Sequence, residues 1–140
     1  KRSISVPFLH IAHATGDAIS LWGLTKIALL GTRFTMEKDF YKKELKEHYG
    51  IDVIIPDPDD INKIHNIIFN ELIKGVIKDE SKEIFKNIIG KLKNKGAEGV
   101  ILGCTEIPLL IQEGDVDIPV FDTTKIHTYK AVDFALGEKR

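Results

Sequence analysis

The sequence has one cysteine, almost no net charge and no long hydrophobic run. A single cysteine excludes an internal disulfide and a cysteine-rich zinc site, and it is typical of a reducing compartment, most simply the cytosol. The 20 basic and 21 acidic side chains leave a net charge of −1, which argues against nucleic acid as the main partner because phosphate binding needs a cationic surface. Every apolar run is far shorter than the ~20 residues that span a bilayer, so no membrane segment is predicted.

The 140 residues suffice for one ordinary domain, and 43% of them are apolar, enough for a hydrophobic core. Short apolar runs alternate with stretches of helical periodicity. The runs predict strands at 6–11, 26–31, 52–56, 99–103 and 118–121, and the periodic stretches between and after them predict helices. Strands separated by helices indicate an α/β fold, with a parallel sheet flanked by helices.

Cys104 is the most informative position because it directly follows the predicted strand at 99–103. In open α/β sheets, ligands bind beyond the carboxyl ends of the strands. A short helix is predicted just after Cys104, and its backbone N–H groups would lower the pKa of the thiol and attract a carboxylate, with the Thr105 hydroxyl as a further donor. From position alone, Cys104 is either a reactive thiol or a small buried apolar side chain.

A second candidate is the turn at 31–35, which also joins a predicted strand to a predicted helix. The hydroxyls of Thr32 and Thr35 and the guanidinium of Arg33 suit an anion, but the segment also reads as an ordinary turn in which Thr35 caps the helix. It lacks the lysine of a phosphate-binding loop, so nucleotide binding is not indicated. The five histidines have no spacing typical of metal ligands, and His48 and His65 are assigned to the surface.

These candidates lie in segments that occur in the order of a known family. Residues 100–111, Val-Ile-Leu-Gly-Cys-Thr-Glu-Ile-Pro-Leu-Leu-Ile, resemble the second cysteine motif of the aspartate/glutamate racemase family. Glu106 makes this motif more similar to the aspartate-racemase branch than to glutamate racemase. Further resembling segments lie at 6–11, 28–37, 67–72 and 119–123. The resemblance covers nearly the whole chain and is closest to the broad-specificity amino-acid racemases of that branch.

The resemblance implies two similar α/β domains with the active site in the cleft between them. In that family one cysteine thiolate removes the α-proton of an amino acid, and a second cysteine thiol protonates the opposite face, without pyridoxal phosphate or a metal. By resemblance, Cys104 is one of these two cysteines. Thr105 would help to hold the α-carboxylate, and Glu106 would support the thiol or the substrate ammonium. The loop of Thr32, Arg33 and Thr35 would line the same cleft.

Two departures from the family pattern affect the expected activity. The other cysteine of the family would lie upstream of Lys1, so two-base racemisation is not expected from this chain alone. Aspartate-specific members also have a lysine two residues before the glycine of the central helix, and here Ile73 stands at that position before Gly75. Lys74 is adjacent, but one helical step turns it to another face. The identity of the amino-acid substrate therefore stays open.

We expect the C-terminal part of a racemase, with a strand of the first domain at 1–14, an α/β domain over 15–122 and a C-terminal helix over 123–140 that packs on the first domain. The expected partner is a small amino-acid substrate. Self-association into a homo-oligomer, most simply a dimer, is expected because a domain without its sister leaves apolar surface uncovered. Two alternatives stay open: a single-cysteine relative, such as a decarboxylase or a cis–trans isomerase, and a non-catalytic, self-associating module.

Overall fold

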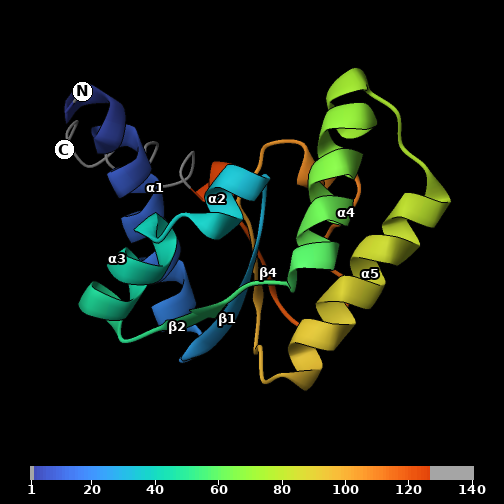
Figure 1. Ribbon diagram of the computed structural model, residues 1–140. Coiled ribbons are helices and arrows are strands. Elements are labelled where there is room, and N and C mark those ends of the chain that lie inside the picture. The colour runs from blue at the N-terminus through green and yellow to red at the C-terminus, as the bar shows by residue number, and fades with distance from the viewer. Residues whose placement is uncertain (1, 127–140) are drawn as a thin grey trace, which may run out of the picture.

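The computed structural model describes residues 2–126, with 2–10 as backbone only, and it places a parallel sheet between two layers of helices (Figure 1). The central strands are β1 (Lys26–Leu30) and β3 (Val100–Leu102), with β2 (Asp52–Ile54) beside β1 and β4 (Val120–Asp122) beside β3. All three strand pairs are parallel. This confirms the predicted α/β fold with a parallel sheet flanked by helices.

One layer consists of α4 (Pro58–Asn70) and α5 (Asp79–Asn94). Asp57 caps α4, because its side chain accepts the backbone N–H of Asp60 at 3.0 Å, and Pro58 stands in the first turn. Both helices place apolar side chains toward the sheet at the predicted helical spacing. The buried apolar side chains are Ile61, Ile64, Ile67 and Ile68 of α4 and Phe85, Ile88, Ile89 and Leu92 of α5.

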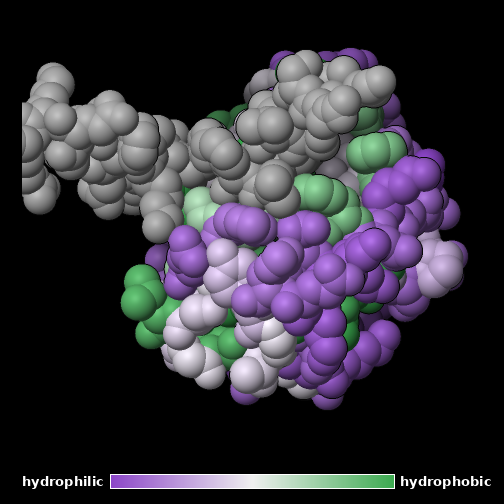
Figure 2. All heavy atoms as spheres, turned by 90° about the vertical axis from the view of Figure 1, so that its left-hand side faces the viewer, coloured by the Kyte–Doolittle hydropathy of each residue, from purple (hydrophilic) through white to green (hydrophobic). Residues whose placement is uncertain are grey.

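The other layer consists of α1 (Arg2–Leu21) and α3 (Phe40–Tyr49), which lie side by side on the left of Figure 1. Gly50 ends α3 as predicted, with a φ of 66° in the left-handed region that favours glycine. The surface seen from this side is largely hydrophilic, with smaller apolar areas between the polar side chains (Figure 2). Polar side chains therefore predominate on the part of this surface that Figure 2 shows in colour.

The strand predicted at Val6–Ile11 is wrong, because α1 runs through this segment without a break. A short apolar run does not distinguish a strand from a helix by periodicity, and here the helical pattern that begins farther along the chain extends back over it. The buried Thr15 fits the helix because its hydroxyl donates to the carbonyl of Ile11 at 2.7 Å. The division of the chain at 14 and 15 remains a prediction.

The remaining elements are short. They are α2 (Arg33–Glu37) and two 3₁₀ helices, η1 (Leu72–Lys74) and η2 (Ile107–Leu109). The cap expected at Thr35 lies instead at Thr32, whose side chain accepts the Thr35 backbone N–H. The chain is helical at 123–126, and the rest of the helix expected over 123–140 lies outside the described residues.

Candidate active site

The candidate site lies where β1 and β3 end side by side. In the strand order β2-β1-β3-β4, the chain passes from β1 to a neighbour on one side and from β3 to a neighbour on the other side. Open α/β sheets bind ligands at the point where the strand order reverses in this way. Leu30 is in register with Leu102, and one residue farther the Gly103 N–H donates to the Leu30 carbonyl at 2.8 Å. The two loops of the sequence analysis therefore start from neighbouring points at one edge of the sheet.

The Thr35 side chain packs against both loops because the residue it meets in each loop, Gly31 or Gly103, has no side chain. A Cβ placed on Gly31 would lie 3.1 Å from the Thr35 side chain, and one on Gly103 would lie 3.3 Å from the Thr35 methyl group. Larger residues at either position would push Thr35 away from the edge of the sheet. The Thr32 hydroxyl donates to the Thr35 hydroxyl at 3.3 Å. The structure thus joins Thr32 and Thr35 to the strand end that precedes Cys104.

Arg33 begins α2 and faces α4. Its backbone N–H donates to Nδ1 of His65 at 3.0 Å, and its guanidinium donates to the side-chain carbonyl of Asn62. The guanidinium also lies 4.0 Å from the Glu37 carboxylate on the same helix. Hydrogen bonds to α4 therefore hold Arg33, and its guanidinium forms an ion pair with the Glu37 carboxylate.

His65 and Asn62 are structural partners that the sequence analysis missed. His65 was assigned to the surface, yet it is half-buried and fixes the backbone of Arg33. These residues lie about thirty positions along the chain from Arg33, and no local pattern links the two segments. Only the packing of α2 on α4 brings them together.

The Cys104 thiol is half-buried and donates to Oε1 of Glu106 at 3.1 Å. Its pKa is raised to about 11, first because burial disfavours the thiolate and then because the Glu106 carboxylate stabilises the protonated form and repels the negative charge. The backbone N–H groups of Glu106 and Ile107 act in the opposite direction and are outweighed. The expectation of a lowered thiol pKa is therefore wrong, since the element that follows is one 3₁₀ turn beside a carboxylate.

Glu106 is the counterpart of this thiol. Hydrogen bonds from Cys104 and then from the Thr105 side chain hold the pKa of its carboxyl below the usual range, so Glu106 is ionised at neutral pH. Thr105 itself is exposed. The structure thus brings Cys104, Thr105 and Glu106 into one hydrogen-bonded group, in which a neutral thiol is a proton donor and an ionised carboxylate accepts.

A hollow of about 290 Å³ lies elsewhere in the described chain, between α1 and the β3–β4 edge. Ala18, Trp22, Leu102 and Phe121 are among the residues that line it. None of the six predicted site residues contributes to its wall. The candidate site at the strand ends is therefore separate from this hollow.

One group of side chains in the described part of the chain has the composition and spacing of a metal site. It consists of His13, Glu44 and His48, whose ligand atoms all lie within 4.8 Å of one another. The prediction that the histidines form no metal-ligand pattern rested on their separation in sequence, and the structure brings two of them together between α1 and α3. This group lies between α1 and α3, apart from Cys104.

The comparisons with known proteins agree with the fold. The family model described as Asp/Glu/Hydantoin racemase matches residues 1–131. A candidate Asp/Glu racemase from Yersinia pestis superposes with a TM-score of 0.87 at 48% identity, over 91% of this chain and 56% of that protein. An aspartate racemase homologue from Pyrococcus horikoshii OT3 superposes with a TM-score of 0.83 at 42% identity, over 89% of this chain and 54% of that protein.

More distant relatives include an aspartate racemase from Picrophilus torridus, with a TM-score of 0.64 and 27% identity over 81% of this chain and 46% of that protein. An uncharacterized protein from Pectobacterium carotovorum is 26% identical over 81% of this chain and 73% of its own length. This chain therefore spans about half the length of the solved racemase structures it matches. In residues 2–126 no helix is long and apolar enough to cross a membrane. By the family model and these structures, the chain belongs to the Asp/Glu/hydantoin racemase family.

Proposed function

We propose that this chain is part of a cofactor-independent amino-acid racemase of the aspartate/glutamate type, in which Cys104 exchanges a proton with the α-carbon. The observation that carries the proposal is the Cys104–Glu106 pair at the carboxyl ends of β1 and β3, in a chain of this family. The raised pKa of the thiol makes Cys104 the resting acid. The corresponding thiolate is a strong base when the reaction runs the other way.

Racemisation needs proton removal on one face of the α-carbon and proton donation on the opposite face. A base on one face takes the α-proton, and the electrons of that C–H bond remain on carbon. Cys104 then donates its S–H proton to the opposite face and becomes a thiolate, which the backbone N–H groups of Glu106 and Ile107 stabilise. The sequence holds one cysteine, so the second base comes from outside these 140 residues. We infer that the 140-residue chain alone does not racemise amino acids.

The neighbouring side chains bind and orient the substrate. Thr105, exposed beside Cys104, and Thr32, just after β1, donate to the α-carboxylate once their hydroxyl protons turn away from Glu106 and Thr35, respectively. Thr35 supports the Thr32 loop by packing over Gly31 and Gly103. Arg33 binds an anionic group only after its guanidinium leaves Asn62 and Glu37. Glu106 accepts from the thiol and is the group available to the substrate ammonium.

The test is α-proton exchange in D₂O by the full-length protein, followed by NMR and chiral chromatography over acidic and neutral amino acids. We expect Cys104→Ser to lower exchange by about 10²–10⁴-fold, since a hydroxyl is a much poorer proton-transfer group. Glu106→Gln tests the carboxylate beside the thiol, and Glu113→Gln, which neutralises an exposed acid, is its control. Full exchange by Cys104→Ser, or none by the wild-type protein with any substrate, overturns the proposal.

Exposed apolar side chains favour the second candidate, a non-catalytic module that self-associates. Leu21 is 89% exposed and Trp22 59% exposed at the end of α1, and Phe34 is 63% exposed on α2. Association into a dimer would remove such surface from water. Light scattering tests it: a monomer at high concentration counts against self-association. Turnover by the 140-residue chain removes the non-catalytic interpretation.

A further inference from the structure

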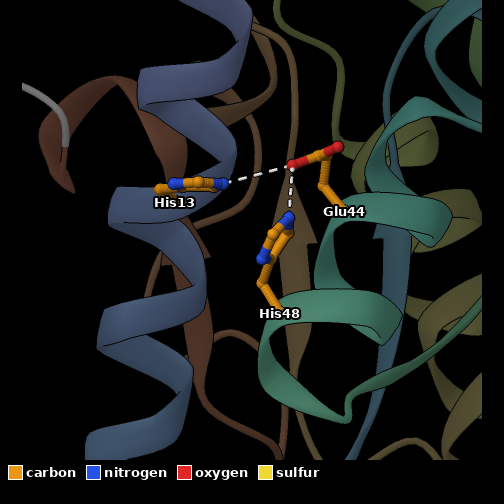
Figure 3. Close-up of side chains that lie close together, drawn as sticks. All are labelled: His13, Glu44 and His48. Atoms are coloured by element: carbon orange, nitrogen blue, oxygen red, sulfur yellow. Dashed lines mark hydrogen bonds and ion pairs between the residues drawn. The ribbon is translucent and has the colours of Figure 1, made fainter.

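The close approach of α1 and α3 brings two histidines and a glutamate together at one point (Figure 3). Nε2 of His13 lies 3.1 Å from Oε1 of Glu44, and Nε2 of His48 lies 3.6 Å from the same oxygen. His48 follows Glu44 by one helical turn, so both side chains leave the same face of α3. His13 reaches them from α1, and the three polar ends converge.

The distances suit tetrahedral coordination. With metal–ligand bonds of about 2.0–2.1 Å, neighbouring ligands of a tetrahedral Zn²⁺ ion lie ~3.3 Å apart. The two separations from Oε1 of Glu44 to the histidine nitrogens, 3.1 and 3.6 Å, lie on either side of this value, and all three ligand atoms lie within 4.8 Å of one another. The ring centroids of His13 and His48 are 5.2 Å apart and the rings are tilted by 58°. The rings therefore are not stacked, and Figure 3 shows a nitrogen of each directed at the carboxylate.

Neighbouring contacts hold the two helices at this separation. The Tyr49 hydroxyl lies 2.8 Å from the His13 carbonyl oxygen and 2.9 Å from the Asp17 carboxylate, so the two acceptors share its one proton. The Tyr49 ring lies against Gly16, where an added Cβ would be 2.4 Å from it. A preformed arrangement of this kind reduces the cost of ordering metal ligands.

We propose that His13, Glu44 and His48 bind a divalent transition-metal ion of the Zn²⁺ type and thereby clamp α1 to α3. Two imidazoles and a carboxylate are a ligand set typical of zinc, with the fourth position left to solvent. Exposed fractions of 40% and 53% for the His13 and His48 side chains leave room for water or an exogenous ligand at that position. Cys104 takes no part in the site, so the proposal is independent of racemase activity.

The test is titration of the full chain, freed of any affinity tag, with Zn²⁺ by calorimetry and with Co²⁺ by visible absorption. We expect one ion per chain and the absorption of tetrahedral Co²⁺. His13→Asn, Glu44→Gln and His48→Asn are each expected to weaken binding at least ~10-fold, because loss of a ligand costs no less than loss of a group behind it. Glu47→Gln, an exposed acid on the same helix, is the charge-matched control and is expected to retain full affinity.

A second measurement reports on the clamp itself. Hydrogen exchange of backbone amides in 11–21 is expected to slow when Zn²⁺ is added to the wild-type protein, and to be unchanged by Zn²⁺ in His13→Asn. Cys104→Ser separates this site from metal binding at the thiol, and it is expected to bind as the wild type does. Three results would each overturn the proposal. They are wild-type affinity for Zn²⁺ in all three ligand variants, loss of binding in Cys104→Ser, and no binding by the wild-type protein at millimolar Zn²⁺.

Discussion

The two faces of the sheet are packed by different kinds of contact. The face beneath α4 and α5 is filled mainly by aliphatic side chains, together with the fully buried Phe85. The face beneath α1 and α3 also has an apolar core, but its outer part consists of aromatic rings and hydrogen bonds around Tyr49 and His13. The first face depends on volume and buried area, and the second depends on the placement of individual atoms. Substitutions on the two faces are therefore expected to lower the stability of the protein for different reasons.

Removing volume from the aliphatic face should have the largest effect. Phe85 is 0% exposed in α5, and Phe85→Ala is expected to lower the free energy of unfolding by about 3–5 kcal/mol. Urea denaturation measures this change. Phe69→Ala on α4 is the matched control, because Phe69 is 45% exposed, and it is expected to cost less than ~1 kcal/mol. Equal losses for the two variants would contradict the assignment of Phe85 to the core.

Adding one carbon to the α1–α3 contact should have the next largest effect. Gly16→Ala places a Cβ against the Tyr49 ring and is expected to cost about 1–3 kcal/mol through overpacking. Gly90→Ala in α5 is the control of opposite sign. An added Cβ there meets nothing within 4 Å, and alanine favours the helix by about 0.5–1 kcal/mol. Thermal melting of both variants checks the pair, and a neutral Gly16→Ala would show that the helices are not in close contact.

Removing one oxygen from the same contact should cost less. Tyr49→Phe keeps the ring but loses the hydrogen bonds to the His13 carbonyl and to Asp17. We expect a loss of about 1 kcal/mol in urea denaturation. The variant should also weaken Zn²⁺ binding, because the backbone of His13 is less firmly held. An unchanged free energy of unfolding would contradict this prediction and would mean that water replaces the Tyr49 hydroxyl at no cost.

The smallest change in stability is expected at the strand ends that the two faces share. Glu106→Gln is expected to alter the free energy of unfolding by less than ~0.5 kcal/mol at neutral pH. It removes the negative charge beside Cys104, so the pKa of the thiol should fall from about 11 while burial keeps it above the ordinary value. The pH profile of alkylation by iodoacetamide measures this shift, and the variant should react faster at mildly alkaline pH. An unchanged profile would contradict the contact between thiol and carboxylate.

The same pKa has a consequence for the wild-type protein. As the pH rises above the ordinary pKa of cysteine, the unfolded chain loses the thiol proton while the folded chain retains it. The contribution of Cys104 to stability is therefore complete below that value and is lost as the pH rises to about 11. Glu106→Gln should narrow this range of pH.

Predictions from sequence succeeded where local pattern and burial agree. The aliphatic spacing of α4 and α5 and the glycine at the end of α3 identified these helices, and buried runs identified β1, β3 and β4. The run at Val6–Ile11 was misassigned because a short segment that is apolar except for His10 fits either a strand or a buried helix. At the candidate site, the place after a strand predicted a role for Cys104, and the resemblance to the racemase family predicted one for Glu106; both roles stay predictions. The direction of the shift in the thiol pKa was predicted wrongly, because it depends on burial and on the orientation of a carboxylate.

By itself the sequence determined the α/β fold of a racemase-family chain, since helical and strand periodicities are local and repeat every few residues. It also placed two loops at strand ends, where a parallel sheet collects them at one edge. Only the tertiary structure decided that His65 holds Arg33 and that His13 meets Glu44 and His48. Contacts between residues some thirty positions apart depend on how two helices pack against each other. The spacing of side chains along the sequence does not predict which residues of the two helices meet.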